Sequence, residues 1–304
     1  MKNKNTIFAT LTALFAQIIF GLSFMFTGIA LKNASPMTVI ADRYIVAFIG
    51  LSVLMVITKR KIRIGKNIWK LILMSIFQPL LYFIFETYGI QMTSSSFSGV
   101  MVSIIPVVSM ISGIFILNEK PTISQYIFAM LSVAGVVIAV LFGKSEGIVT
   151  TPGVILLLGA VFSSVGYNIS SRKISAEFST FERTYAMSFI GMISFLLVSF
   201  IENFNNPISI FSPFTNISYT VSILYLGVFS SVIAFLCLNF ANTHLPVAKT
   251  TVFSNLTTVV SVLAGAFILN EVVSKEIIVA IIMIIIGVFG VQISNRKDNR
   301  NLKP

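Results

Sequence analysis

The sequence has a single cysteine, Cys237, and a single histidine, His244, among its 304 residues. One cysteine excludes an intramolecular disulfide framework and a thiolate cluster, and one histidine cannot make a multi-histidine metal site. We therefore expect no metal and no cofactor. Charge is also scarce, because only 10% of the residues are charged. A water-soluble globule of this size would lack a polar surface.

Apolar residues make up 56% of the chain, and the mean hydropathy is +0.95. Roughly 17 to 25 residues cross the hydrocarbon core as a helix. Lipid offers no partner to backbone amides, and the alternating pattern of a membrane barrel is missing. The sequence therefore predicts an all-α integral membrane protein with ten transmembrane helices, at about 7–31, 36–58, 68–90, 97–117, 122–142, 152–171, 182–201, 217–240, 247–269 and 274–294.

The net charge of +11 comes from short basic clusters between the apolar runs, which favours topology signals over a nucleic-acid surface. Of the 21 basic residues, the connections on one side would hold all but Lys32, Arg43, Lys144 and Lys275. By the positive-inside rule we expect a multi-pass protein of the cytoplasmic membrane with both termini in the cytoplasm. The polar tail from Asn295 to Pro304 is expected to be disordered.

An internal repeat organises the chain. The stretch VVSMISGIFILNE from Val107 to Glu119 matches VVSVLAGAFILNE from Val259 to Glu271 at a constant offset. We expect two five-helix repeats, at 1–146 and 147–304. Because five is odd, the two repeats would lie in the membrane with opposite orientations. In secondary transporters this symmetry places a substrate site near mid-bilayer, between the halves.

Each half closes with a glycine-rich helix, a Leu-Asn-Glu turn and a further helix with a late Gly-Val. Pro36 is followed by Arg43 in the second span, and Pro106 lies in the fourth. In their order and duplication these features resemble the drug/metabolite transporter superfamily, in particular its EamA-domain branch. The resemblance implies a ten-helix bundle that moves amino acids, amines, sugars or related metabolites by alternating access, without ATP hydrolysis. Its small relatives carry a carboxylate in the first helix, where this chain offers only Gln17.

Glu86 is predicted to be the only acidic residue well inside an apolar segment, so it is the leading candidate for a substrate and proton-coupling site. Gln78, Tyr82 and Glu86 recur at helical spacing and would form one polar stripe. A buried carboxyl group there could bind either a proton or an organic cation, and their competition would couple the two movements. The alternative is that Glu86 lies near the headgroups or is permanently bonded to a neighbouring helix.

Other polar residues inside the spans are candidates for the cavity wall. The further substrate-binding candidates are Tyr82, Gln17, Ser103, Tyr167, Asn168, Tyr225, Asn239 and Asn255. Ser103 lies on a small-residue face with Gly99, which also suits close helix packing, and Asn255 is the equivalent position in the second half. Glu119 and Glu271 are expected to stabilise the amino end of the helix that follows each of them.

These features predict a secondary transporter, with export favoured, of amino acids or organic amines and cations. A lipid or polyprenyl-linked carrier could share the fold. An integral membrane enzyme is disfavoured, because paired metal-binding acids, several histidines and a phosphate-binding glycine loop are missing from the sequence. The expected partners are a small-molecule substrate and membrane lipid, without nucleic acid, and the chain would act as a monomer or a homodimer.

Overall fold

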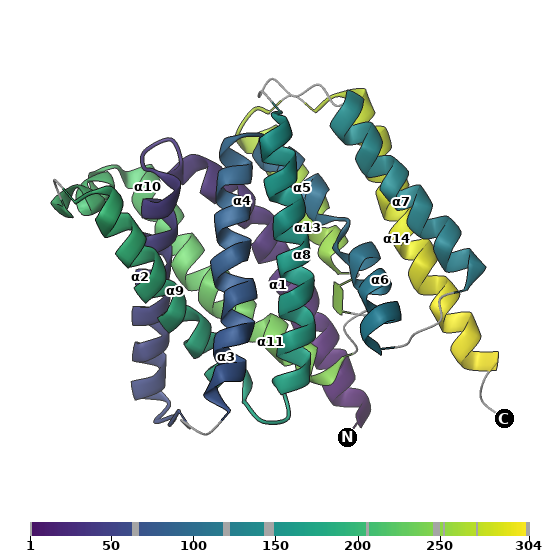
Figure 1. Cartoon of the computed structure of the whole chain (residues 1–304), viewed down its shortest axis with the longest axis horizontal. Coiled ribbons are helices and arrows are strands. Elements are labelled where there is room, and N and C mark those ends of the chain that lie inside the picture. Colours follow the sequence, from purple (N-terminus) through teal and green to yellow (C-terminus); the bar gives the residue numbers. More distant parts are fainter. Residues whose placement is uncertain are drawn as a thin grey trace.

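The structure is a computed structural model, and it describes residues 2–62, 67–117, 122–142, 149–204, 207–245, 250–251, 253–271 and 273–301. Within these ranges, side chains are not described at 2–6, 113, 114, 117, 136, 139–141, 207–210, 288 and 291–301. Every described regular element is helical (Figure 1). The expectation of an all-helical fold is confirmed for the described residues, but the boundary proposed at 146 and the Asn118-Glu119 turn lie outside them.

The first half begins with α1 (Lys2–Ala30) and α2 (Pro36–Ile57). Its third span starts as α3 (Ile68–Ser75), continues through the π-helical segment η1 (Ile76–Leu81) and ends as α4 (Tyr82–Gln91). Then come α5 (Ser95–Val102), α6 (Ile105–Leu117) and α7 (Ile123–Phe142).

The second half begins with α8 (Thr151–Ile174) and α9 (Thr180–Glu202), followed by the 3₁₀ segment η2 (Pro207–Thr215). A long span is built from α10 (Ile217–Leu224), the π-helical segment η3 (Tyr225–Ala234) and α11 (Phe235–His244). The chain ends with α13 (Ser254–Ile268) and α14 (Lys275–Asn301), so helical backbone covers most of the tail that was expected to be disordered.

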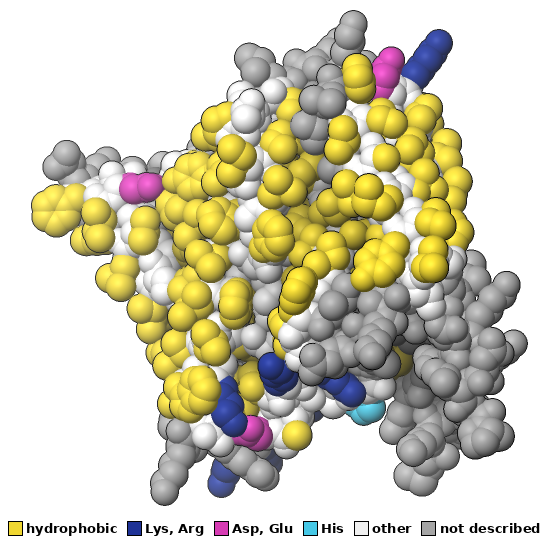
Figure 2. All heavy atoms as spheres, turned by 45° about the vertical axis from the view of Figure 1, so that its right-hand side comes forward, with side chains coloured by type: hydrophobic (Ala, Val, Ile, Leu, Met, Phe, Trp, Pro, Cys, Tyr) yellow, Lys and Arg dark blue, Asp and Glu magenta, His cyan; other side chains and the backbone are white. Residues whose placement is uncertain are grey.

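Length and composition make these helices suitable for a bilayer. Seven described helical stretches are long and apolar enough to cross a membrane, and the shorter stretches Ile123–Gly135 and Ser254–Ile268 are also apolar. Large apolar side chains such as Phe115, Phe267 and Ile217 are about four-fifths exposed. In Figure 2 apolar side chains cover the middle of the molecule, and most basic ones lie at its lower edge. A surface of this kind requires lipid as its solvent.

Helix starts follow local capping chemistry. The Ser35 hydroxyl accepts a hydrogen bond from the Thr38 amide ahead of α2, where Pro36 suits the first helical position. Ser179 and Glu182 form a capping box at the start of α9. These caps satisfy amides that the helix itself leaves unpaired, and this explains why the observed starts lie close to those predicted from hydropathy.

The third span is interrupted at Gln78, whose backbone angles (φ −149°, ψ 115°) are not helical. Pro79 accounts for the interruption, because proline has no amide proton and its ring clashes with the carbonyl one turn earlier. Gln78 lies at this break, and both Gln78 and Glu86 are buried in the bundle.

Small residues allow the closest helix crossings. In α14, a side chain at Gly287 would come within 2.6 Å of the Phe128 carbonyl of α7. Between α5 and α13, the Thr258 hydroxyl donates to the Gly99 carbonyl at 2.9 Å, and Ser261 lies over Gly99. The seam that was predicted around Gly99 therefore packs one half of the chain against the other. The helices α2 and α9 form a third such pair, and Tyr44 packs on Gly191 there.

The Leu-Asn-Glu turn of the second half caps a helix far away in the sequence. Asn270 ends α13 with a positive φ of 56°, a conformation that asparagine tolerates. The Glu271 carboxylate then accepts hydrogen bonds from the amides of Ser95 (3.1 Å) and Ser96 (2.9 Å), in the first turn of α5. The expectation that Glu271 serves the helix that follows it was wrong.

The basic side of the bundle also carries an ion pair. Lys70, at the start of α3, pairs with Glu177 in the connection between α8 and α9, and the Asn67 amide donates to the same carboxylate at 2.7 Å. The hydrogen bond from Lys70 lowers the pKa of Glu177 below its usual range. Figure 1 shows that α1 begins and α14 ends on this side.

Candidate functional site

A cavity lies in the middle of the bundle. Its wall is formed by α1, α2, the η1–α4 segment, α5, the first residue of α6, α8, α11, residues 250–251 and the start of α13. The volume open to the centre of a water-sized sphere is about 50 Å³, and the whole space between the side chains, open solvent included, is about 570 Å³. The polar part of the wall consists of Gln17, Ser23, Arg43, Gln78, Tyr82, Glu86, Ser164, Asn168, Thr250, Thr251, Ser254 and Thr257. In the described parts of α7 and α14, no side chain lines it.

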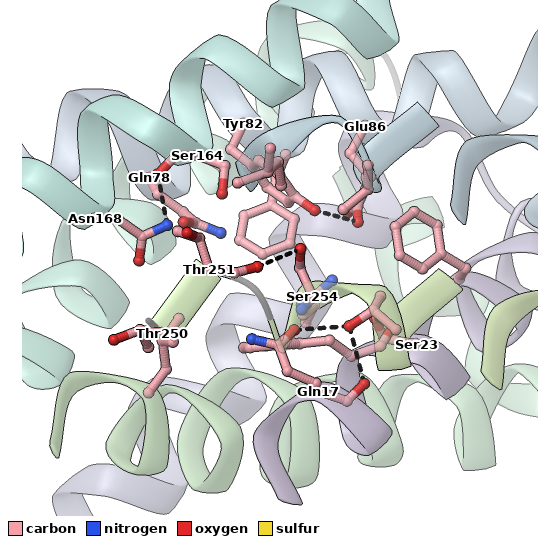
Figure 3. A pocket seen from close by; sticks show the side chains of 18 residues that line it. Gln17, Ser23, Gln78, Tyr82, Glu86, Ser164, Asn168, Thr250, Thr251 and Ser254 are labelled. Atoms are coloured by element: carbon pink, nitrogen blue, oxygen red, sulfur yellow. Dashed lines mark hydrogen bonds between the residues drawn. The ribbon is translucent and has the colours of Figure 1, made fainter. Parts of the chain in front are cut away.

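Glu86 is 3% exposed and faces this cavity from α4. One carboxylate oxygen accepts a hydrogen bond from the Tyr82 hydroxyl at 3.0 Å, one helical turn earlier, and the other oxygen has no partner (Figure 3). A buried carboxylate with an unused oxygen is unfavourable unless a proton or a cation arrives. The arrangement therefore has an unused binding capacity for a positive group.

Arg43 reaches the same cavity from α2 and is 2% exposed. Its Nε donates to the Ser231 hydroxyl at 2.7 Å, and one terminal nitrogen donates to the Ser230 hydroxyl at 2.8 Å. The guanidinium also lies over the Phe83 ring, 4.1 Å from its centroid. Both serines belong to the π-helical segment η3, so this irregular segment holds the cation in place.

The sequence analysis assigned Arg43 to an outer connection, and this was wrong. Arg43 lies two turns inside α2. The error arose because hydropathy alone places the edge of an apolar run at the first charged residue near its end. The available signal was the short distance from Pro36, which leaves Arg43 seven residues into a capped helix. A charged residue at that depth is expected to face a polar interior.

The two opposite charges do not neutralise each other directly. Within the described residues the only ion pair closer than 4.0 Å is the one between Lys70 and Glu177. Glu86 and Arg43 thus present a carboxyl group and a guanidinium to one cavity without an ion pair within 4.0 Å, although the two charges attract each other electrostatically. A molecule that carries a cation, or both a cation and an anion, fits this arrangement by charge.

Amide and hydroxyl groups form other parts of the wall. Gln17 of α1 accepts from the Thr257 hydroxyl through both its side chain (2.7 Å) and its backbone carbonyl (3.0 Å). Asn168 of α8 donates to the Ser164 carbonyl at 2.9 Å and accepts from Asn242 at 3.0 Å. In Figure 3, Gln78 lies near Asn168 and Ser164, while Gln17 and Ser23 lie below. Residues from both halves therefore meet here.

Five predicted site residues do not line this cavity. Ser103 is fully buried and its hydroxyl donates to the Val100 carbonyl. Tyr225 donates to the Ile19 carbonyl at 3.1 Å and stacks on Phe26, and Asn255 is buried with no hydrogen-bond partner for either amide atom. Tyr167 and Asn239 belong to a second buried network. The structure thus brings Gln17, Tyr82, Glu86 and Asn168 together and separates the others.

That second network centres on Arg183, which the sequence analysis had counted among the basic connections. Arg183 is fully buried in the first turns of α9. It donates to the Ser171 hydroxyl (2.7 Å), the Asn239 carbonyl (3.0 Å) and the Thr243 hydroxyl (2.5 Å). Tyr167 donates to the Asn239 side chain at 2.8 Å. A cation near the carboxyl end of α11 suits the helix dipole, so we interpret this network as a structural clamp on α8, α9 and α11.

Asp42 is a second buried acid that the sequence analysis overlooked. It lies in α2 next to Arg43 and is 1% exposed. The Tyr219 hydroxyl of α10 donates to one of its oxygens at 2.6 Å, and the other oxygen has no partner. The statement that Glu86 is the only acid well inside a span was therefore wrong. Across the described residues, no cluster of three or more acids, histidines or cysteines could hold a metal ion.

Comparison with known proteins gives these observations a family. The sequence profile of the EamA-like transporter family matches the chain twice, at residues 7–141 and 151–293. The chain belongs to the EamA-like transporter family. The resemblance stated from the sequence is therefore confirmed, and the molecule is a membrane transporter.

Three relatives of this EamA-like transporter are named only as transporters. It is 32% identical to the "Uncharacterized transporter YcxC" of Bacillus subtilis, over 96% of this chain and 95% of that protein. It is 26% identical to YetK of the same organism over 77% of this chain, and 23% identical to a transporter of Archaeoglobus fulgidus over 88%. A solved crystal structure shares the fold, with a TM-score of 0.68 over 93% of this chain and 98% of that one at 15% identity.

Proposed function

We propose that this EamA-like transporter is a secondary carrier that exports small metabolites, amino acids or organic amines, across the cytoplasmic membrane. The single observation that carries the proposal is the central cavity, to which Glu86 and Arg43 contribute opposite charges that do not pair with each other. An ammonium group would bind the Glu86 carboxylate, and a carboxylate, where the substrate has one, would bind the Arg43 guanidinium.

Two inverted five-helix repeats, ten spans in all, are the architecture that we propose for this movement. Two pairs of helices that would be equivalent in the repeats pack on each other, namely α2 with α9 and α7 with α14, and α5 packs on α13, which belongs to the equivalent span of the other half. The third span of each half would contain a π-helical segment, η1 and η3. The two matches to the family profile fall on the two halves. Figure 1 shows α1 and α8, the first helix of each half, running in opposite directions.

Alternating access follows from this symmetry. Because the two halves would be related by symmetry, each could adopt the packing arrangement that the other has in this structure. The cavity would then open to one side of the membrane at a time. Glu86 would bind a proton on one leg of the cycle and the substrate cation on the other. Because both compete for the same carboxylate, proton entry would drive substrate exit. The basic side of the bundle would face the cytoplasm, and both termini with it.

Transport into proteoliposomes under an imposed pH gradient tests the proposal. The Glu86→Gln protein should fold and insert but lose pH-driven uptake of amines and amino acids, because the amide cannot exchange a proton. Glu202→Gln, at an exposed acid on α9, is the matched control and should transport normally. Lipid scrambling is measured in the same vesicles. Scrambling without metabolite uptake, or full pH-driven uptake by Glu86→Gln, would reject the proposal.

A further inference from the structure

We propose that Asp42 is a second proton-binding site, separate from the central cavity, that controls opening between α2 and α10. The inference presupposes the carrier cycle proposed above, but it does not depend on the role of Glu86. It rests on the contact between Asp42 and Tyr219, which joins two helices at the end of the bundle opposite the basic side.

The position of Asp42 favours the neutral carboxyl group while the two helices are in contact. One oxygen accepts from Tyr219, and the other is buried without a partner. Tyr219 itself packs in an apolar cluster with Ala30, Val39 and Ile223. An ionised carboxylate that receives one hydrogen bond in such surroundings is poorly stabilised, whereas a protonated one is not penalised for burial.

Most other titratable groups on the neighbouring helices have hydrogen-bond partners other than Asp42. Arg43 turns to Ser230 and Ser231, and Glu86 accepts from Tyr82. On α9, Glu182 caps its own helix, Arg183 binds Ser171, and Glu202 accepts from Ser35 at 3.4 Å. On η3, the Tyr225 hydroxyl donates to the Ile19 carbonyl. Between residues 7 and 30, α1 carries no titratable side chain. Tyr219 is the group that these helices offer to Asp42.

Asp42 lies near the start of α2, at the end of the bundle opposite the basic side. It lies six residues after Pro36, or about 9 Å along the helix axis at 1.5 Å per residue. Separation of α10 from α2 would hydrate the carboxyl group and allow it to ionise. Protonation therefore stabilises the closed arrangement, and loss of the proton favours the open one. Asp42 thus links the proton concentration outside to the opening of that end, while Glu86 exchanges its proton in the cavity.

Thiol labelling can measure this opening. The native cysteine is first removed as Cys237→Ala, and Ile223→Cys then places a probe in α10, one turn after Tyr219, at a fully buried position of the same apolar cluster. A membrane-impermeant maleimide reports its exposure. The ratio of labelling rates between the protein with Asp42 and the protein with Asp42→Asn, at each pH, removes the intrinsic pH dependence of the thiol.

We expect that ratio to rise with pH and to approach about tenfold per pH unit where only the open form is ionised. Asn mimics the neutral acid, so Asp42→Asn should label slowly at every pH tested. Tyr219→Phe, which removes the hydroxyl and keeps the ring, should raise labelling at low pH by several-fold. Equal pH profiles for Asp42 and Asp42→Asn would overturn the inference.

The same labelling in a Glu86→Gln background separates this inference from the proposed function. The pH dependence should persist there even though pH-driven transport is lost. If Glu86→Gln removes the pH dependence of labelling, the second site is wrong and Glu86 alone senses the proton. If Glu86→Gln transports normally while Asp42→Asn abolishes the pH dependence of labelling, Glu86 is not the proton-coupling residue of the proposed carrier. The assignment of Asp42 as a proton-binding site is then supported.

Discussion

At the level of single residues, the central cavity depends on how two buried charges are held apart. The Glu86 carboxylate accepts a hydrogen bond from Tyr82, one turn earlier in the same helix, so its position is set by local helical geometry. Arg43 depends on a distant segment, because its two hydroxyl partners lie on η3. The planar guanidinium can satisfy both hydroxyls and stack on Phe83 at once, which a lysine ammonium cannot do.

Arg43→Lys should therefore weaken the binding of substrates that carry a carboxylate. The loss of a charged hydrogen bond, roughly 1.5–3 kcal/mol, corresponds to an increase in KM of about tenfold or more. Amines without a carboxylate should keep their KM, because they use Glu86. Arg60→Lys, at an exposed arginine on the basic side, serves as the control. Uptake kinetics for an amino acid and its decarboxylated amine provide the measurement, and an equal change for both would contradict the assignment.

Residue-level prediction from the sequence succeeded where the interaction is local. The spacing of Gln78, Tyr82 and Glu86 predicted one polar stripe, and all three line the cavity, although Gln78 does so from the break in the helix. Their functional roles stay predictions. Tyr225 and Asn255 were chosen by the same criterion of polarity within a span, but helix rotation turns them away from this cavity, and one sequence contains no measure of that rotation.

At the level of elements, the turn that closes α13 joins the two halves. Glu271 supplies both oxygens to the amides of Ser95 and Ser96, and Gly265 leaves the room for it, because a side chain there would come within 2.6 Å of the carboxylate. The negative charge also faces the positive end of the α5 dipole. The contact spans 176 and 175 residues of sequence, so no local pattern could predict it.

Glu271→Ala should lower the free energy of unfolding by about 1–2 kcal/mol, the usual loss when a helix cap is removed. Thermal unfolding of the purified protein in detergent is the measurement, and the midpoint should fall by a few degrees. Glu271→Gln keeps one acceptor oxygen and should give an intermediate value. Glu202→Ala, at an exposed acid that accepts a single 3.4 Å hydrogen bond, should leave the midpoint unchanged. Equal midpoints for the two alanine variants would exclude this cap as a source of stability.

At the level of the whole molecule, hydropathy predicted ten spans, and seven described helical stretches are long and apolar enough to cross a membrane. The basic clusters predicted one side of the bundle, although Arg43 and Arg183, which were counted with the connections, are buried within helices. Charge counting cannot separate a connection from the first turns of a helix. The cavity itself could not be derived, because it forms where helices from both halves meet, and their contacts connect residues far apart in the chain.

The proposed inverted arrangement predicts opposite exposure of equivalent connections. Lys32 follows α1 and Glu177 follows α8, the first helix of each half. In the Cys237→Ala background, Lys32→Cys should react with an impermeant maleimide from outside, and Glu177→Cys only after the membrane is opened. Lys59→Cys and Lys275→Cys extend the test to one more connection on each side. Reaction of Lys32→Cys and Glu177→Cys from the same side would exclude the inverted repeat.

The helices α7 and α14 pack against each other along their lengths, and their described side chains take no part in the cavity wall. Substrate preference then has no direct influence on their sequences, which are constrained by the close crossing at Gly287 and by the surrounding lipid. In relatives that have diverged toward other substrates, these two helices should have changed independently of substrate. A chimera that exchanges only this pair between relatives should keep the substrate range of the protein that supplies the remaining helices.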